Sequence, residues 1–256
     1  MEDADVRRLN ARSLVLSVLL GLPTPRLATS SPPRLAELFG IAPGTMRTAI
    51  SRMLATGELA AIDGGYELRG ERLLARKRAQ DIGRRPPGDA WDGSWWLVTV
   101  LEPARTLAAR RDFRAVMTNA RMGELRPDTW LRPANLASPA DVDGSIVVRG
   151  ALAGADPGDL VTRLWDLHSI GVHSAELLTA LRSAAAQLSS QGARVLAETT
   201  LVAAAVVRFL RAEPLLPRRL VPADWPVDSL RDLYADFDRA YGRVLREALR
   251  DQPPLP

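Results

Sequence analysis

Hydrophobic side chains in residues 41–68 repeat first with the spacing of a helix and then with that of a hairpin. The helical part forms a single apolar stripe, made by Met46, Ala49, Ile50, Met53 and Leu54. Gly57 ends this helix, and residues 59–62 and 66–68 read as two strands around the tight turn at 63–65. The pattern therefore predicts a helix followed directly by a β-hairpin.

The other side of the predicted helix carries basic and short polar side chains and no carboxylate. These residues are Thr45, Arg47, Thr48, Ser51 and Arg52. Such groups suit phosphate oxygens and the edges of bases in the major groove. A DNA-recognition helix followed by a wing is the sharper interpretation, and a surface helix with a hairpin that merely packs is the alternative.

The residues upstream of this helix favour a winged helix-turn-helix. Residues 10–20 are mostly apolar and predict a buried helix, 24–33 form a proline- and serine-rich connector, and 34–39 predict a short helix. A turn at 40–44 then leads into the recognition helix. The order of helix, connector, short helix, turn, helix and hairpin matches a winged helix.

A second region begins after the paired prolines at 86–87, which are expected to end a helix. Residues 95–101 form a continuous apolar run that predicts a buried strand, and 103–119 predict a helix. A short strand around a turn at 125–131 and a strand at 145–149 follow. Strand, helix, strand, strand and then helix is the order of a ferredoxin-like domain.

The remainder of the chain has helical apolar spacing in four segments, at residues 160–170, 174–188, 193–210 and 229–249. Prolines between positions 214 and 226 interrupt the chain before the last of them. We therefore expect an α+β protein with three domains. They are a winged helix at 1–86, a ferredoxin-like domain at 90–160 and a mainly helical effector and dimerisation domain at 161–256.

Charge is distributed unevenly along the 256 residues. Residues 1–85 hold 14 basic and 9 acidic side chains, a net charge of +5, whereas the remainder has a net charge of −1. Excess positive charge in the first third is expected if that part meets DNA phosphates. The chain has no cysteine, which excludes disulfides and thiolate zinc sites.

Nothing in the sequence predicts a membrane segment or a secretory signal. The first residues are acidic and then basic, and the apolar stretch at 196–210 carries Glu198 and Arg208 and is too short to span a bilayer. We expect a cytoplasmic protein.

Three groups of residues together give the chain a resemblance to the PaaX family of transcriptional repressors. The first is ARSLVLSVLLG with MRTAISRMLATGEL, and the second is GSWWLVTVLEP leading to GELRPDTWLRPANL. The third is RLWDL followed by RFLRAEPLLPRRLVPADWP. The resemblance covers about residues 11–246, and the second and third groups are the more specific.

This resemblance implies a winged helix, a central domain similar to a CRISPR-adaptation nuclease, and a helical C-terminal domain. It also implies a homodimer that represses catabolic operons and releases operator DNA when an aromatic acyl-CoA, typically phenylacetyl-CoA, binds. Carried onto this chain, Thr45, Arg47, Thr48, Ser51 and Arg52 face the major groove of double-stranded DNA, and Gly64 and Gly65 lie at the wing tip. One departure is HSIGVH after RLWDL, where the family usually has an aromatic-containing helix, so the effector here can differ.

An acyl-CoA pocket needs cations for phosphates and an apolar slot for the acyl group. The candidates are Trp165, Arg218, Arg219 and Trp225, in a pocket between the central and C-terminal domains. The alternative is that the arginines are ordinary surface residues and that Trp165 belongs to the core.

Two other functions stay open on the sequence, a metal-dependent nuclease and a DNA-binding protein without an effector. At the end of the first central strand stands Glu102, a lone carboxylate and a weak ligand set for Mg²⁺. The two histidines, His168 and His173, have a poor spacing for metal ligands on one helix face. No glycine-rich nucleotide loop or nucleophile elbow occurs, so we expect no enzyme activity, no metal and no cofactor.

Overall fold

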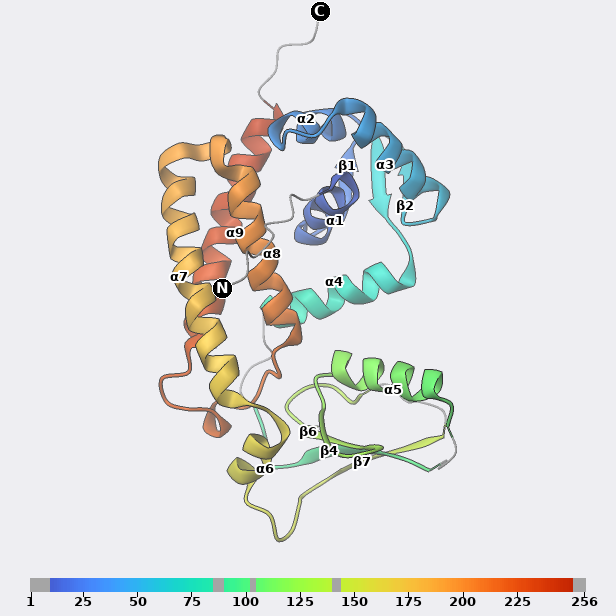
Figure 1. Cartoon of the computed structure of the whole chain (residues 1–256), viewed down its shortest axis with the longest axis vertical. Coiled ribbons are helices and arrows are strands. Elements are labelled where there is room, and N and C mark those ends of the chain that lie inside the picture. The colour runs from blue at the N-terminus through green and yellow to red at the C-terminus, as the bar shows by residue number, and fades with distance from the viewer. Residues whose placement is uncertain (1–9, 85–89, 102–104, 140–143, 251–256) are drawn as a thin grey trace, which may run out of the picture. The chain divides into compact units, whose positions relative to one another are not determined.

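The computed structural model describes residues 10–84, 90–101, 105–139 and 144–250 (Figure 1). The protein is α+β, with two small antiparallel sheets and a helical C-terminal part, as the sequence predicts. It divides into two compact units that do not follow the predicted domain boundaries. Unit 1 comprises residues 1–78, 179–206 and 233–256, and unit 2 comprises residues 79–178 and 207–232. The part predicted as one C-terminal domain, 161–256, contributes to both units.

Unit 1 begins with α1 (Ala11–Gly21), which the side chain of Asn10 caps by accepting a hydrogen bond from the Ser13 backbone at 2.8 Å. Most of this helix is buried, as its apolar sequence predicts. It is followed by β1 (Arg26–Ala28), α2 (Ser31–Leu38), α3 (Pro43–Ala55), β2 (Leu59–Ile62) and β3 (Gly65–Leu68). The three strands form an antiparallel sheet in the order β1-β3-β2.

The segment 24–33, predicted as a connector, contains both β1 and the start of α2. Pro32 and Pro33 lie in the first turn of α2, where proline is tolerated because the first backbone N–H groups have no partner within the helix. The prediction of a short helix confined to 34–39 is therefore wrong at its beginning.

Residues 179–206 and 233–256, which are parts of three C-terminal helices, complete unit 1. These helices are α7 (Leu167–Gln191), α8 (Leu196–Ala212), which follows a short 3₁₀ turn, and α9 (Pro226–Arg250). Within unit 1 the hydroxyl groups of Thr200 and Tyr241 are hydrogen-bonded, and burial raises the pKa of Tyr241 to about 12. Arg34 of α2 donates from Nε to the backbone oxygen of Ala248 in α9 at 2.9 Å.

Unit 2 is built on the sheet of β4 (Trp95–Val100), β5 (Gly123–Arg126), β6 (Thr129–Pro133) and β7 (Ser145–Gly150). The strands lie in the order β5-β6-β4-β7, and every neighbouring pair is antiparallel. One face packs against α5 (Leu107–Asn119) through Val98, Phe113, Met117 and Trp130. The other face packs against α6 (Pro157–Leu164) through Trp95, Leu131 and Val161.

One detail of unit 2 differs from the predicted pattern, whereas the helix after the last strand agrees with it. The predicted strand around a turn at 125–131 is a hairpin of β5 and β6, with Asp128 in its turn at a positive φ of 63°. The residues described between β6 and β7, 134–139 and 144, contain no helix, and α6 follows β7 and covers the opposite face from α5.

The helix predicted at 160–170 is two helices, because the chain breaks at Trp165 and Asp166. The side chain of Asp166 accepts a hydrogen bond from the Ser169 backbone at 2.9 Å and so caps the start of α7. Beyond this cap α7 continues without interruption to Gln191. Within the described part of the chain, no helix is long and apolar enough to cross a membrane.

Candidate nucleic-acid interface

The orientation of α3 is fixed by its buried side. Met46, Ile50 and Met53 are each at most 6% exposed and pack into the core of unit 1. Gly57, at a positive φ of 71°, follows the helix, and Glu58 donates its backbone N–H to the carbonyl of Met53 at 2.9 Å. The helix thus leads directly into β2, as the sequence predicts.

The opposite side of α3 is exposed at every position predicted to contact DNA. These residues are Thr45, Arg47, Thr48, Ser51 and Arg52. The hydroxyl of Thr48 donates to the carbonyl of Gly44 at 2.9 Å, which leaves its oxygen lone pairs available as acceptors. The structure therefore brings all five side chains onto one outward face.

The two arginines of this face differ from most arginines of the surrounding elements. Arg12 pairs with Glu58, Arg34 with Glu37, and both Arg26 and Arg69 with Glu67. Among the residues that the structure describes, neither Arg47 nor Arg52 has a carboxylate within 4.0 Å. Their guanidinium groups are thus free to bind an anion without first breaking an ion pair.

The hairpin that follows α3 separates the two glycines predicted for the wing tip. Gly64 is exposed in the turn, at a positive φ of 70°. Gly65 is buried in β3, where a Cβ atom would lie 2.5 Å from the backbone oxygen of Leu27 in β1. Gly65 therefore allows two strands to pack closely, and Gly64 is the exposed glycine of the predicted wing tip. Beside Gly64 the exposed carboxylate of Asp63 makes the tip acidic.

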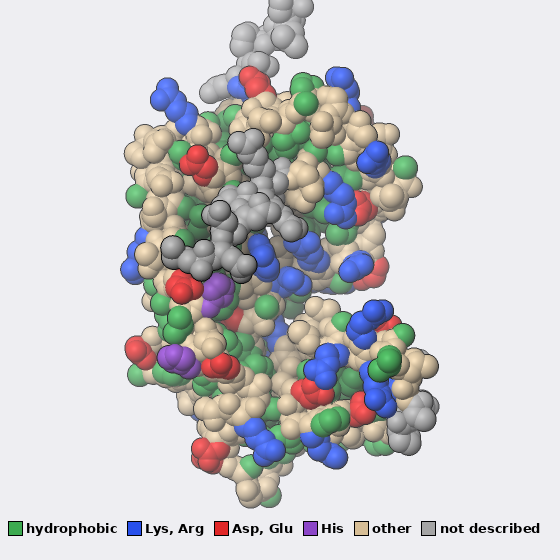
Figure 2. Space-filling view, in the orientation of Figure 1, with side chains coloured by type: hydrophobic (Ala, Val, Ile, Leu, Met, Phe, Trp, Pro, Cys, Tyr) green, Lys and Arg blue, Asp and Glu red, His purple; other side chains and the backbone are tan. Residues whose placement is uncertain are grey.

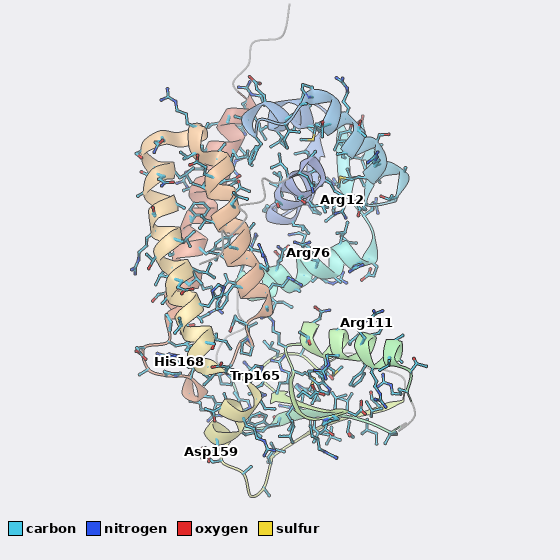
Figure 3. The ribbon with its side chains drawn as sticks, viewed as in Figure 1. Arg12, Arg76, Arg111, Asp159, Trp165 and His168 are labelled. Atoms are coloured by element: carbon cyan, nitrogen blue, oxygen red, sulfur yellow. The ribbon has the colours of Figure 1, made fainter. Side chains whose placement is uncertain are left out.

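The helix α4 (Glu71–Arg84) adds basic side chains next to the hairpin, in the region where Figure 2 shows several Lys and Arg groups. Arg72 and Arg76 are exposed, and Arg78 forms an ion pair with Glu71 of the same helix. Figure 3 marks Arg76 on this helix. The beginning of α4 thus extends the cationic surface of unit 1.

The four predicted effector residues all belong to unit 2, and their side chains have different surroundings. Arg218 donates to the backbone oxygens of Pro222 and Ala223, and Nη2 of Arg219 donates to the backbone oxygen of Trp91 at 2.6 Å. The guanidinium of Arg219 also lies 4.2 Å from the centre of the Trp91 ring. The guanidinium groups of Arg218 and Arg219 therefore stabilise the local conformation of the chain.

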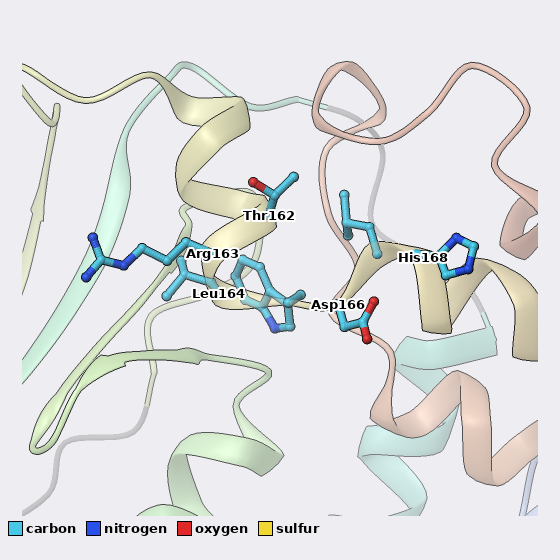
Figure 4. A pocket seen from close by; sticks show the side chains of 7 residues that line it. Thr162, Arg163, Leu164, Asp166 and His168 are labelled. Atoms are coloured by element: carbon cyan, nitrogen blue, oxygen red, sulfur yellow. The ribbon is translucent and has the colours of Figure 1, made fainter.

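A surface hollow in unit 2 is lined by residues 162–168 (Figure 4). Trp165 lies in this lining and is half-buried, whereas Trp225 is 8% exposed and packs against α7 near Gly171. Of the four predicted residues, Trp165 is the one that borders this hollow, and the pocket itself stays a prediction.

The residues considered for metal chemistry also have other surroundings. Glu102 lies outside the described residues. His173 contacts Glu176 at 3.4 Å and the ring of Phe209 at a centroid distance of 5.4 Å. In the described ranges, no group of three or more His, Asp or Glu side chains is placed to hold a metal ion.

Sequence reasoning missed a buried network of arginines at the centre of unit 2. Arg121 donates to the backbone oxygens of Leu210 and Glu213, and Arg132 donates to that of Ala120 at 2.9 Å. Burial lowers the pKa of Arg121 and of Arg132 to about 10. No local pattern marks these arginines, because some of their partners lie about ninety residues away along the chain.

The fold and this surface define an α+β protein that presents an exposed, partly basic helix beside a hairpin. No family model matches the sequence, and no curated protein is similar to it. A solved structure of the uncharacterized protein Rv0674 from Mycobacterium tuberculosis is 37% identical in sequence, covers 94% of this chain and 99% of its own, and superposes with a TM-score of 0.71. The chain belongs to the same protein family as Rv0674.

Proposed function

We propose that the protein is a transcriptional repressor of the PaaX type, which binds double-stranded operator DNA through α3 and releases it when an aromatic acyl-CoA binds. In this proposal it acts in the cytoplasm as a homodimer and has no enzyme activity. Unit 1 reads the DNA, and unit 2 contributes the effector and dimer contacts.

The order of elements in unit 1 supports a winged helix-turn-helix. Three helices precede a hairpin, and the short β1 joins that hairpin in one antiparallel sheet. In folds of this kind the helix before the hairpin enters the major groove. Here that helix is α3.

The observation that carries the proposal is the outward face of α3. It places two arginines without ion-pair partners, among the described residues, beside three exposed hydroxyl side chains. Arginine binds guanine or phosphate through two parallel hydrogen bonds, and hydroxyls bind either groove edges or phosphates. A helix face that only covered a protein core would instead carry apolar side chains, and a merely solvated face would usually mix both charges.

The sheet of unit 2 supports a ferredoxin-like central part, in which the described residues between β6 and β7 form no second helix. Its order, β5-β6-β4-β7, with antiparallel neighbours, is that of a split βαβ arrangement in which β4 and β6 are central. We assign this part to partner contacts, since no metal cluster is found in the described residues.

DNA binding is tested by selecting bound sequences from a random duplex library and measuring affinity by fluorescence anisotropy. Arg47→Ala and Arg52→Ala should each weaken binding by about 1–3 kcal/mol, and should relax the base preference at one position if they read bases. Loss of a phosphate contact should instead reduce the dependence of log affinity on log salt by about 0.9.

The matched control is Arg111→Ala, which removes the same charge from the exposed face of α5 in unit 2 (Figure 3). It should leave affinity and salt dependence unchanged. Equal affinities for wild type, Arg47→Ala and Arg52→Ala, with unchanged circular dichroism, would rule out α3 as the DNA-binding element.

A further inference from the structure

The two edge strands of the unit 2 sheet differ in how well they are protected from pairing with another strand. β5 has a register irregularity between Glu124 and Arg126, and Glu124 forms an ion pair with Arg114 at 2.6 Å. Irregularities and charges of this kind discourage edge-to-edge association. β7 has no such irregularity and carries one charged residue, Arg149: it pairs regularly with β4 over six residues, and no strand in the described ranges pairs with its outer side.

The unprotected edge also exposes apolar side chains. Leu101, Ile146 and Val148 are 60%, 43% and 48% exposed, and they are three of the six large exposed hydrophobic residues in the described chain. The register pairs Ile146 with Thr99 and Val148 with Leu97, so all three lie on the sheet face that also carries α6. Neither α6 nor the segment that follows α8 covers this corner.

We propose that β7 pairs in antiparallel fashion with β7 of a second copy of the chain, around a two-fold axis at Val147. In this register Ile146 lies directly opposite Val148 of the second copy, and Val148 lies opposite Ile146. The exposed apolar side chains of the two copies thus meet on one face of a continuous eight-stranded sheet. This inference rests on the homodimer of the proposed function and names its contact, but it does not depend on DNA binding.

The charges of β7 are compatible with its pairing to a second copy of the chain. Arg149 is the single charged residue of β7, and in this register it lies opposite Ser145 of the second copy, away from the other Arg149. It is already neutralised by Asp92, at 2.7 Å, and lies 5.8 Å from the centre of the Trp96 ring. Pairing two copies therefore places no like charges opposite each other, and Arg149 keeps Asp92 as its ion-pair partner.

The number of residues in the contact determines the dimer affinity that we expect. β7 contributes six residues, with Leu101 beside it, whereas stable interfaces use about 20–30 residues on each side. We therefore expect a concentration-dependent dimer with a dissociation constant on the order of micromolar.

Disulfide trapping tests the register, because the chain contains no cysteine. Directly opposed residues of antiparallel strands have Cα atoms about 4.5–5.5 Å apart, within the range of a disulfide. A mixture of Ile146→Cys and Val148→Cys should form a covalent dimer under mild oxidation, and much more of it than either variant alone. A mixture of Leu107→Cys, which is on α5 and also exposed, with Val148→Cys should not.

Sedimentation velocity of the full chain over a range of concentrations tests the interface itself. Ile146→Lys combined with Val148→Lys should raise the dimer dissociation constant by about 100-fold or more, whereas Val172→Lys, at an equally exposed site on α7, should not change it. A monomer at all concentrations would overturn the proposal. A dimer that withstands the double substitution and gives no mixed disulfide would overturn it as well, because the contact would then lie elsewhere.

Discussion

Nη2 of Arg231, in α9, lies 2.7 Å from Oε1 of Glu213, and both side chains are almost completely buried in unit 2. The second carboxylate oxygen of Glu213 accepts the backbone N–H of Leu215 at 3.0 Å, and Nε of Arg231 donates to the backbone oxygen of Gly83 at 3.1 Å. The pair thus joins the start of α9, the chain after α8 and the end of α4. Hydrogen bonds within the fold replace those to the water that both charged groups lose on burial.

Removing one member of this pair should be costly. Glu213→Ala leaves the buried guanidinium of Arg231 with the half-exposed Asp228, at 3.1 Å, as its remaining carboxylate, and we expect unit 2 to lose about 3 kcal/mol of stability. All six tryptophans lie in unit 2, so the tryptophan fluorescence during urea unfolding reports this unit. Glu176→Ala breaks an exposed contact with His173 in the same unit and should change stability by no more than about 0.5 kcal/mol. Equal, small effects of both substitutions would contradict the structural role given to Glu213.

Two helical glycines of unit 2 should respond to the same substitution with opposite sign. A Cβ atom on Gly83 of α4 would lie 2.3 Å from the backbone oxygen of Leu210, so Gly83→Ala must displace backbone and should cost about 1–3 kcal/mol. On Gly171 of α7 the nearest atom, in Trp225, would be 3.6 Å away, an ordinary contact. Gly171→Ala should therefore stabilise the helix by about 0.5–1 kcal/mol. The two unfolding curves should shift in opposite directions, and a stabilised Gly83→Ala variant would show that α4 and α8 do not approach this closely.

Local sequence patterns predicted the elements that carry a hydrophobic pattern of their own. The apolar stripe of α3 and the continuous apolar run of β4 are each sufficient to identify the element to within about a residue at each end. The strand β1 was missed because its three residues pair with β3, some forty residues later, and carry no periodicity of their own. Sequence alone does not reveal such a partner.

The candidate site was likewise predictable only where a local sequence pattern marks its residues. The outward face of α3 follows from helical geometry, so its five residues were identified correctly as exposed neighbours. The close packing of Gly65 was not predicted, because the turn pattern does not show that β1 lies against it. The partners of Arg218 and Arg219 were not predicted either, because backbone carbonyls leave no mark in a sequence.

Because the carboxylate of Asp166 caps α7, the stability of the fold should decrease at acidic pH. Hydrogen bonds from the hydroxyl and the backbone N–H of Ser169 lower the pKa of Asp166 below its ordinary value. A carboxyl whose pKa is lower in the folded state contributes stability above its unfolded pKa, near 4, and loses it as the pH falls toward the folded value. Asp166→Asn keeps a capping side chain that does not ionise.

We therefore expect the melting temperature of Asp166→Asn to lie below that of wild type at pH 7 and to approach it as the pH falls from about 4 toward 2. Asp224→Asn, at an exposed position, should show no such closing gap. A difference between Asp166→Asn and wild type that is the same at pH 7 and pH 2 would mean that the charge of Asp166 does not stabilise the fold.

The effector response predicted for a repressor of this type can be followed with one signal for each unit. The six tryptophans report ligand binding in unit 2, and the anisotropy of labelled DNA reports binding by α3 in unit 1. Phenylacetyl-CoA should change the fluorescence and lower the DNA affinity, whereas coenzyme A alone and phenylacetate alone should do so only at far higher concentrations. A ligand can shift DNA binding only by favouring one conformation over another. DNA must then weaken phenylacetyl-CoA by the same factor that phenylacetyl-CoA weakens DNA.

Substitution of Trp165 tests where the ligand binds, because the half-buried indole borders the hollow lined by residues 162–168. Trp165→Phe should reduce both the fluorescence change and the affinity for phenylacetyl-CoA, whereas DNA affinity without ligand should remain that of wild type. If phenylacetyl-CoA binds tightly and DNA affinity stays constant, effector control is excluded while DNA binding stands. If the ligand lowers DNA affinity equally in wild type and Trp165→Phe, the effector acts at a site other than this hollow.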